Sequence, residues 1–599
     1  MTDDDDDTVG HTSEGLQVEL FHPESDRKPG DTNIERWGFD VHPVVFPFAV
    51  VIIIAFVTAT LALGDDASAA YSAVFDFINV NFGWFYILSV NVFIGALLFF
   101  AFSKYGKIRL GGVEAEKEFS TFAWMAMLFS AGMGIGLMFF SVAEPMWHLG
   151  TGGGNLFDVA PQSGQAAQAA MGVTFFHWGF HPWAIYGLVA LGLAFFSFNR
   201  GLPLTFRSVF YPLLGDRIYG WPGHVIDLVT VFATLFGLAT SLGLGAQQVN
   251  VGLSRVTETL TGSSLVPIGI TSQVAIIAVI TAIATASVAA GLEGGVKRLS
   301  TLNVYIMFIF LGFILVAGPT LYLLDAIPQS IGFYLQNIAY MSFFTESFMG
   351  EAVGGFPQGG YQNWQHFWTV FYWGWWIAWS PFVGLFIARI SKGRTVRQMV
   401  VGVLLIPTAF SFVWLGAFGG AALYAQQVLG TGLYTTLTEA ESFGQARAMF
   451  AMLEAFPLTT LTSVVAVLLV TTFFVTSSDS GSLVVDHLTS GGKHDVPRVQ
   501  RIFWAVSEGA VAAVLLIGGG SAATNALQTA AITTGLPFAA ILLLMVYTVY
   551  LGLDTEYEIL QSEEFRERIG EMSGESDVVV NRSGGDIVTG VREGTETDD

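Results

Sequence analysis

The stretch VVFPFAVVIIIAFVTATLAL, residues 44–63, contains no charged side chain. A helix needs about 20 apolar residues to cross the hydrocarbon of a bilayer, so this stretch predicts a membrane span. Similar blocks recur along the 599 residues, of which 53% are hydrophobic and only 12% charged, with a mean hydropathy of +0.58. This composition is too apolar for an ordinary soluble multidomain protein. We expect an all-α integral membrane protein.

Long apolar blocks between charged connectors predict twelve spans. They begin near Pro43, Gly83, Phe119, Gln165, Trp221, Pro267, Thr301, Trp364, Val396, Leu458, Val499 and Thr524. The acidic string Met1 to Asp7 does not resemble a signal peptide, so we expect the first span to be retained. The stretch Ile327 to Glu346 is apolar but interrupted by glutamines. It predicts an interfacial amphipathic helix on the outer side rather than a thirteenth span.

Most of the net charge of −23 comes from the two ends of the chain. Residues 1–40 and 554–599 are expected to be acidic cytoplasmic tails around a transmembrane domain of residues 41–553. Lys and Arg occupy alternate connectors, among them residues 104–117 and 493–501, which predicts cytoplasmic termini in the cell membrane. The acidity does not suit nucleic-acid binding. The lack of cysteine excludes disulfides and thiolate chemistry.

The third predicted span contains GMGIG, Gly132 to Gly136. Glycines two positions apart lie about 200° apart around a helix, which suits a broken helix better than a packing face. Irregular backbone at membrane depth lines a cavity or is buried, and freed carbonyls there can hold an ion. Close packing against a neighbouring helix remains the alternative.

The tenth predicted span carries a cluster of hydroxyl side chains around Asp479. The members are Thr471, Thr472, Thr476, Ser477, Ser478, Ser480 and Ser482. An acid inside a membrane is a candidate functional group, and hydroxyl and carbonyl oxygens suit a small hard cation. The alternative is that each hydroxyl bonds a carbonyl of its own helix. Proton coupling through Asp479 also stays open.

The eighth predicted span is rich in tryptophan. Trp364, Trp368, Trp375 and Trp379 fall within about 80° of one another on one helix face, whereas Trp373 points elsewhere. Trp364 and Trp368 suit a membrane interface or a substrate pathway, but the later members lie at hydrocarbon depth. Several ring faces around a cavity hold a quaternary ammonium group by cation–π attraction.

The fourth predicted span adds Trp178, Trp183 and Tyr186, and Pro182 is expected to distort the helix between the two tryptophans. His177 and His181 are one turn apart, but no carboxylate is near them in the sequence, so we expect packed histidines rather than a metal pair. Glu144-Pro145 is interpreted as a helix end facing water, with no assigned role.

The run WTVFYWGWWIAWSPFVGLFIARISKGRT, residues 368–395, resembles the signature segment of the betaine/choline/carnitine transporter family. FHWGFHPWAIYG (176–187), GMGIG (132–136) and TSSDS (476–480) resemble the same family in the same order. The resemblance covers roughly residues 41–553. It implies two inverted five-helix repeats, the third to seventh and the eighth to twelfth spans, with broken helices at the midplane. It also implies a homotrimer.

The resemblance also implies functional residues. The substrate would contact Trp178, Trp183, Tyr186, Trp376, Trp379, Met133, Gly134 and Gly136, with Trp373 and Trp375 along its path. One sodium ion would use carbonyls of Ser130, Met133 and Phe473 and the hydroxyls of Thr476 and Ser477. A second sodium site would use Thr234 and Phe382, but Leu238 stands where the family has a hydroxyl, which puts that site in doubt.

Gly136 indicates the substrate, because choline carriers of the family tend to have aspartate at that position. The expected function is therefore sodium-coupled uptake of glycine betaine by alternating access, in the service of osmoprotection. Other solutes of the family, namely choline, carnitine, ectoine and dimethylsulfonium compounds, are the alternative, and an ion channel is the alternative from a different class. No phosphate loop, nucleophile elbow or zincin helix is visible, so we expect neither an enzyme nor a cofactor other than Na⁺.

Overall fold

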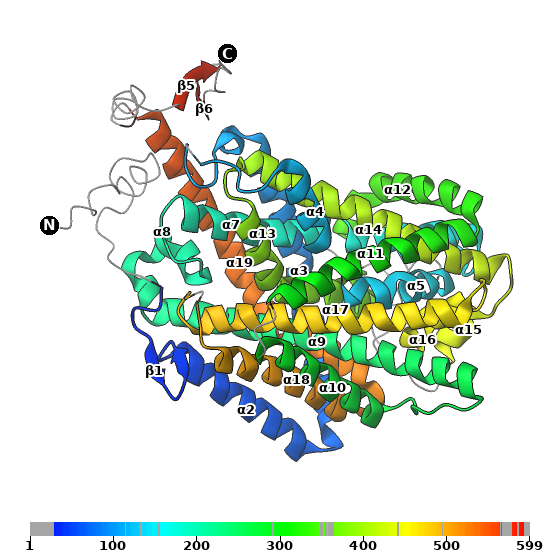
Figure 1. Cartoon of the computed structure of the whole chain (residues 1–599). Coiled ribbons are helices and arrows are strands. Elements are labelled where there is room, and N and C mark those ends of the chain that lie inside the picture. Colours follow the sequence, from blue (N-terminus) through cyan, green and yellow to red (C-terminus); the bar gives the residue numbers. More distant parts are fainter. Residues whose placement is uncertain are drawn as a thin grey trace, which may run out of the picture.

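The computed structural model describes residues 29–562 apart from 114, 132–133, 152–155, 290–292, 348–351, 354–355, 358–363, 440–442 and 494, together with 565, 578–583 and 586–591. These residues form a bundle of long helices (Figure 1). Helices α9 and α17 run side by side across the view in Figure 1. The three strand pairs are short hairpins.

The longer helices are α2 (Val45–Leu63), α3 (Asp66–Phe102), α4 (Thr121–Ala131), α5 (Ile135–Gly150), α6 (Gly164–Trp178), α7 (Phe180–Phe198), α9 (Trp221–Thr261), α10 (Ile270–Ala289), α11 (Glu293–Ala317), α12 (Thr320–Ser342), α13 (Phe371–Ile390), α14 (Val396–Gln427), α17 (Thr459–Thr489), α18 (Arg498–Gly519) and α19 (Ala523–Gln561). Short helices are α8 (Tyr211–Leu214), α15 (Leu433–Thr438) and α16 (Gly444–Leu453). A π-helical turn, η5 (His366–Val370), precedes α13. The hairpins pair β1 (Ile34–Arg36) with β2 (Phe39–Val41), β3 (Ala352–Val353) with β4 (Phe356–Pro357), and β5 (Val578–Ser583) with β6 (Asp586–Val591).

Within the described residues, 10 helical stretches are long and apolar enough to cross a membrane, or up to 11 if the bent pair α4 and α5 forms one span. The stretch 498–561 counts once here, although a 3-10 turn at Gly520–Ala522 divides it into α18 and α19. The integral membrane architecture is therefore confirmed. The exact count of twelve and the inverted repeats stay predictions.

The third predicted span is broken, as its glycine pattern favoured. Helix α4 ends at Ala131, α5 begins at Ile135, and the two axes differ by 62°. Gly132 and Met133 lie outside the described residues, whereas Gly134 has an extended backbone and precedes α5. The break turns the start of α5 toward the centre of the bundle, where Gly136 is buried.

The fourth predicted span is also interrupted, but at Gly179 rather than at Pro182. Gly179 has a non-helical backbone between α6 and α7. A Cβ atom there would lie 2.5 Å from the Phe175 carbonyl oxygen and 2.9 Å from Tyr334 Oη, so only glycine fits without a shift. Pro182 is in the first turn of α7, where its missing N–H costs little.

The predicted interfacial helix exists as α12 and begins at Thr320, earlier than the expected Ile327. Its Leu323, Tyr334 and Met341 are buried, and it packs against α6 and α14. It is not among the described helices that are apolar enough to cross a membrane.

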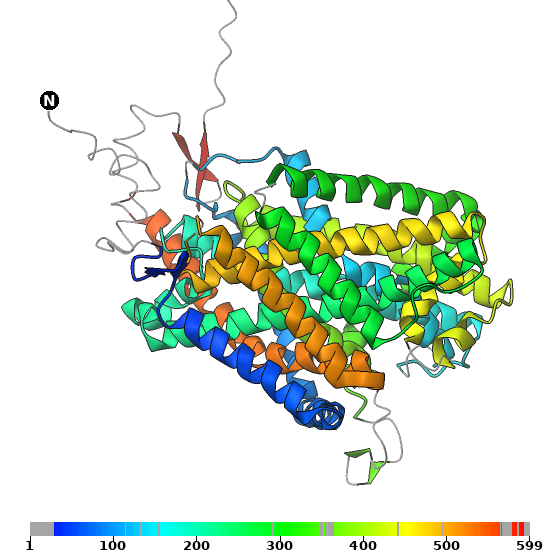
Figure 2. The same ribbon diagram turned by 60° about the horizontal axis from the view of Figure 1, so that its bottom comes forward.

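Connectors rich in Lys and Arg meet at one end of the molecule. The Leu110 amide donates to the Arg394 carbonyl (2.9 Å), and the Gly111 amide donates to Asn199 Oδ1 (2.8 Å). Asn199 in turn donates to Glu556 of α19 (3.1 Å). Hairpin β1–β2 and the end of α19 lie at this same end in Figures 1 and 2. The basic connectors around residues 110, 199 and 394 therefore lie on the same side of the bundle, as the predicted alternation of basic connectors requires.

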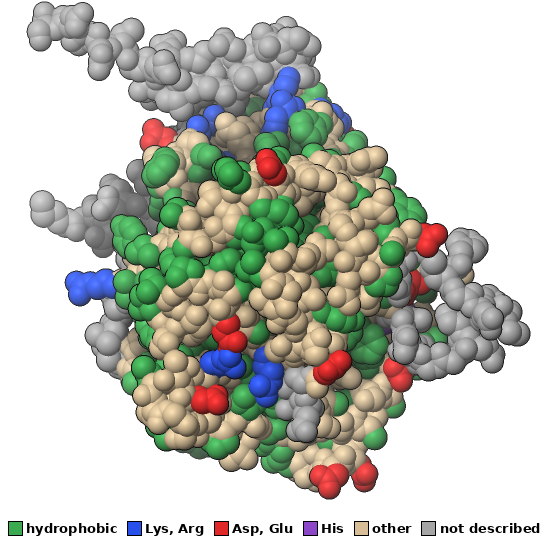
Figure 3. Space-filling model, turned by 90° about the vertical axis from the view of Figure 1, so that its right-hand side faces the viewer, with side chains coloured by type: hydrophobic (Ala, Val, Ile, Leu, Met, Phe, Trp, Pro, Cys, Tyr) green, Lys and Arg blue, Asp and Glu red, His purple; other side chains and the backbone are tan. Residues whose placement is uncertain are grey.

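The opposite end of the molecule carries α15, α16 and the end of α9. Figure 3 shows this end, where hydrophobic and uncharged side chains cover most of the described surface and charged ones are scattered. Arg255 of α9 pairs with Glu454, which follows α16. The basic connectors lie at the other end of the molecule, and such a difference in positive charge between the two ends is what the charge pattern predicts for a protein that crosses a membrane.

Candidate functional site

The two predicted aromatic sets meet around one cavity inside the bundle. Its lining comprises Gly134, Gly136, Leu137, Trp178, Pro182, Trp183, Tyr186, Ser241, Trp375, Trp376, Trp379, Val383 and Ser411. Every predicted substrate residue is among them except Met133, which lies outside the described residues. None of these described lining residues has a charged side chain. Trp375, predicted along the path, also lines the cavity, whereas Trp373 stacks on His181 with ring centroids 5.4 Å apart.

Trp376 lies at the centre of the aromatic rings. The Trp178 ring meets it at 74° with centroids 4.8 Å apart, and the Trp375 ring stacks on it at 13° and 4.8 Å. The Tyr186 ring lies edge-on at 6.4 Å. Trp183 in turn packs edge-on against Tyr186 at 5.3 Å. Such tilted and stacked arrangements are those that aromatic side chains prefer.

The indole N–H groups of this cluster bond to the protein. Trp376 donates to the His177 carbonyl (3.0 Å), Trp375 to Ser241 Oγ (3.2 Å) and Trp379 to the Gly237 carbonyl (3.0 Å). Buried indoles need such acceptors, and the bonds fix the orientation of each ring. The polar edges of these three rings are thus satisfied, and a solute would meet their faces.

Gly136 limits the size of this cavity. A Cβ atom there would lie 2.8 Å from Trp375 Cη2 and 2.9 Å from Trp178 Cη2. Both distances are shorter than ordinary carbon contacts, so any side chain at this position pushes the two indoles apart. The glycine therefore lets rings from α6 and α13 approach each other over the start of α5.

A second, larger cavity of about 450 Å³ adjoins the first. Four of the predicted sodium residues line it, namely Ser130, Phe473, Thr476 and Ser477. The fifth, Met133, lies outside the described residues. Trp379 and Val383 line both cavities and form the wall between them.

The hydroxyl cluster of α17 is in part engaged with its own helix. Thr476 Oγ1 bonds to the carbonyls of Thr472 (3.0 Å) and Phe473 (3.2 Å), as the alternative interpretation expected. Asp479 instead pairs with Arg501 of α18 at 3.6 Å. The acid that appeared unpaired in the sequence therefore has a cationic partner on the next helix.

The residues of the doubtful second sodium site have different surroundings. Thr234 is fully buried in α9, and its hydroxyl donates to the Thr230 carbonyl at 2.8 Å. Phe382 lines the larger cavity. Leu238 packs against α17, where a Cβ on Gly481 would lie 2.3 Å from it. At the position where the family has a hydroxyl, this protein therefore has an apolar side chain packed against α17.

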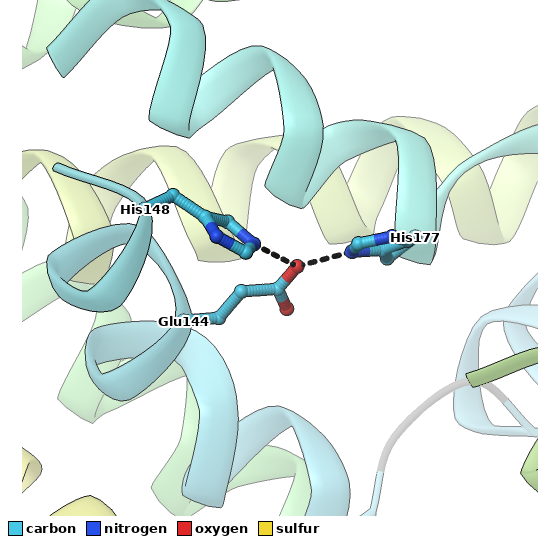
Figure 4. A group of neighbouring side chains, drawn as sticks. All are labelled: Glu144, His148 and His177. Carbon is cyan, nitrogen blue, oxygen red and sulfur yellow. Dashed lines mark hydrogen bonds and ion pairs between the residues drawn. The ribbon is translucent and has the colours of Figure 1, made fainter. Parts of the chain in front are cut away.

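Glu144 was wrongly expected to face water at a helix end. Its side chain is fully buried, and α5 continues through Pro145 to Gly150. Glu144 Oε2 accepts from Trp178 Nε1 (2.8 Å) and Tyr372 Oη (2.5 Å). Oε1 lies 2.6 Å from His177 Nδ1 and 3.4 Å from His148 Nε2 (Figure 4). Two residues of the aromatic cluster are therefore held by one acid that the sequence analysis set aside.

The same contacts correct the expectation that no carboxylate lies near His177. Ligand atoms of Glu144, His148 and His177 lie within 4.8 Å of one another, a spacing that a metal could bridge. His177 Nε2 also bonds Thr369 (2.9 Å), and both oxygens of Glu144 have partners. Hydrogen bonds therefore account for this cluster without an ion.

Trp364 and Trp368 do not lie at a lipid interface. Each is only 4% exposed. Trp364 donates to His148 Nδ1 (3.1 Å), and the Trp368 ring packs against the His148 ring at 4.7 Å. The interfacial part of the prediction is wrong, because α5 covers this face of the span. Their place along a pathway stays a prediction.

The model of the betaine/carnitine/choline transporter family (BCCT) matches residues 44–558. The chain belongs to this family. As a BCCT protein it is a multi-span membrane transporter and not an enzyme. The resemblance drawn from its motifs is thereby confirmed.

Curated relatives of this BCCT protein are similar over most of its length. Glycine betaine transporter 1 of Vibrio parahaemolyticus is 46% identical over 536 residues, which cover 89% of this chain and 97% of the relative. A glycine betaine/proline/choline transporter of the same organism is 45% identical, covering 87% of this chain and 91% of the relative. A probable glycine betaine transporter of Desulfitobacterium hafniense is 40% identical, covering 84% and 96%.

Proposed function

We propose that this transporter imports a quaternary-ammonium solute, glycine betaine, by sodium-coupled alternating access. The observation that carries the proposal is the first cavity, where six aromatic side chains gather and the described lining has no charge. Each ring face contributes about 0.5–2 kcal/mol to binding a cation, depending on desolvation. A zwitterion suits such a site, because its ammonium group is held by rings and its net charge is zero. The names of the relatives support the same solute.

Sodium would bind where α4 and α17 face the second cavity. Thr476 and Ser477 would bring hydroxyl oxygens there, and Ser130 and Phe473 would bring backbone carbonyls. Oxygen ligands of this kind suit a small hard cation. Trp379 belongs to both cavities, so an ion in one and a solute in the other would contact opposite sides of the same wall. This shared wall gives the ion a physical route to bias solute binding.

The second cavity would open to the cytoplasm in this conformation. It is lined by Ser300 and Thr301, which lie within four residues after the basic pair Lys297 and Arg298 in the sequence. Basic residues at span ends favour the cytoplasmic side, where both termini would then lie in the cell membrane. A homotrimer and a role in osmoprotection complete the proposal. Both rest on the family resemblance.

The deciding experiment is uptake of labelled glycine betaine into proteoliposomes with and without an inward sodium gradient. Accumulation above the external concentration is expected only with the gradient. Uptake that is indifferent to sodium would refute the coupling, and rapid downhill flux of ions without solute would favour a channel. An imposed proton gradient at constant sodium tests the proton-coupled alternative.

Choline and proline are the competing solutes, because one relative is named for both besides glycine betaine. Gly136 favours the zwitterion, since the site lacks an acid in its lining to pair with the net positive charge of choline. Competition by unlabelled choline, proline, carnitine and ectoine against labelled betaine ranks them directly. Stronger competition by choline than by betaine would reverse the assignment.

A further inference from the structure

Glu508 of α18 is a fully buried acid that the proposed mechanism does not use. One carboxyl oxygen, Oε2, lies 3.3 Å from Ser478 Oγ of α17. The other, Oε1, has no hydrogen-bond partner among the described residues. An ionised carboxylate with one weak partner is very costly at membrane depth, and such an acid is a candidate functional group.

The nearest described charges are already paired with each other. Asp479 follows Ser478 and forms an ion pair with Arg501, which lies on α18 about two turns before Glu508. Arg501 therefore neutralises Asp479, and Asp479 adds a negative field at Glu508. Neither residue of this pair stabilises an anion at position 508.

The helices packed around α18 bring no cation to this depth. Helices α2 and α10 contain no charged or histidine side chain at all. The charges of α9 lie near its ends, none between Asp227 and Arg255, and α19 has none before Asp554. Helix α3 contacts α18 near Gly518, where it brings Tyr71, about 15 Å along the helix from Glu508. The acidic residues of α3, Asp66 and Asp76, would only disfavour an anion further.

A second unpaired group lies beside Gly509, the residue that follows Glu508. Thr281 of α10 is buried, and its hydroxyl has no hydrogen-bond partner among the described residues. It points at α18, because a Cβ on Gly509 would lie 2.4 Å from Thr281 Oγ1. Figures 1 and 2 show α18 beside α10 and α17. Among the described residues, the surroundings of Glu508 thus hold two hydroxyls, and the cation of α18 on this side, Arg501, is already paired with Asp479.

We propose that Glu508 is a proton-binding site of this transporter. A proton forms one O–H bond at the carboxylate and leaves to water as that bond breaks, so no other reactant is required. Sodium would need several oxygen ligands, and among the described residues Ser478 is the one hydrogen-bond partner that the carboxyl group has here. The second cavity, lined by Ser477 and Ser480, reaches the same turn of α17 and gives the proton a way to water.

The consequence for transport rests on the proposed function. Glu508 contacts α17 at the residue after Thr476-Ser477, so a charge on the acid is expected to change the packing of the helix that would carry sodium. The rate of uptake at constant sodium should then depend on pH. On one side of the pH at which Glu508 titrates, the rate should change by up to about tenfold per pH unit. Glu508→Gln, which imitates the protonated acid, should flatten this change to less than about twofold over the same interval.

The site itself is tested without transport, on the purified full-length protein in lipid. Infrared difference spectra between two pH values should contain the C=O stretching band of a protonated carboxyl group. Glu508→Gln should remove that band. Glu556→Gln is the matched control and should keep it, because buried Glu556 already has a cationic partner, Arg200, and lies away from Ser478 and Thr281. Ser478→Ala retains the acid and should shift the band rather than remove it.

A band that persists in Glu508→Gln overturns the proposal, as does a band that responds to sodium at fixed pH instead of to pH. An unchanged pH profile of uptake in Glu508→Gln overturns the role in transport. If the band behaves as expected but glycine betaine is not taken up at all, the proton site holds and the proposed substrate fails. If Glu508→Gln does not fold, the shift in Ser478→Ala decides the assignment.

Discussion

Replacing Glu144 by Gln is expected to weaken glycine betaine binding about tenfold to thirtyfold. Trp178 and Tyr372 both donate to one oxygen of the acid, at 2.8 Å and 2.5 Å. Hydrogen bonds to a charged group contribute about 1.5–3 kcal/mol and those to a neutral group about 0.5–1.5 kcal/mol, so each bond loses about 1 kcal/mol. Two bonds give about 2 kcal/mol, and 1.4 kcal/mol is a factor of ten.

The loss should fall on binding because both donors touch the central ring of the cavity. The Trp178 and Tyr372 rings contact the Trp376 ring at 4.8 Å and 5.8 Å. When their acceptor weakens, the rings spend less time in the arrangement that receives the solute, and the apparent affinity falls in proportion. Tyr372→Phe removes one donor and keeps the ring, so its effect should be smaller than that of Glu144→Gln.

Calorimetric titration of the purified protein with glycine betaine measures the affinity, and thermal unfolding of the same samples reports whether each variant is folded. Ser141→Ala is the matched control on the same helix. Ser141 is fully buried, and its hydroxyl has no partner among the described residues, so this change should leave the affinity within about twofold. Affinities of Glu144→Gln and Tyr372→Phe that match this control would refute the reasoning.

Three further changes test other parts of the structure. Gly136→Asp should lower betaine affinity at least about tenfold and favour choline, because the new side chain parts Trp375 from Trp178 and adds a negative charge; equal competition by choline in both proteins would contradict this. Thr476→Ala should raise the sodium concentration for half-maximal uptake several-fold, whereas an unchanged value would reject this ligand. Burial and the neighbouring Arg207 lower the pKa of His42 to about 3, so its imidazole stays neutral and accepts from the Val44 and Val45 amides. Because the unfolded pKa is 6.5, its contribution of about 1 kcal/mol should be present above that pH and decrease as the pH falls below it; melting temperatures of His42→Ala and the parent protein should therefore converge in acid.

The cavity could be predicted from sequence because aromatic side chains at hydrocarbon depth have few roles other than packing and recognition. Trp178, Trp183 and Tyr186 do lie in the same cavity as Trp376 and Trp379. The rotation of about 100° per residue in a helix indicated which aromatic side chains share a face of each span. The motif resemblance was needed to bring the two sets together, since they are separated by nearly two hundred residues.

The role of Glu144 could not be predicted, because its partners come from elsewhere in the chain. His177 is 33 residues away and Tyr372 is 228 residues away. The following proline suggested a helix end, yet α5 continues because a proline removes only one hydrogen bond. The ion pair of Asp479 could not be predicted either, because its partner Arg501 belongs to the next helix. The break at Gly179 depends on the close approach of Tyr334, which local sequence does not reveal.

One aromatic side chain, Trp379, lies in the wall between the two cavities, so a solute that passes from the first cavity to the second has to pass its indole. Trp379 is held by a single bond from its indole to the Gly237 carbonyl, and a Cβ on Gly237 would lie 3.0 Å from the same ring. A methyl group at position 237 would therefore displace the indole, although Gly237 itself lines neither cavity. Because Trp379 lines the aromatic site as well as the wall, Gly237→Ala should change both how fast solute leaves and how tightly the site binds it, which links release rate to recognition through one side chain.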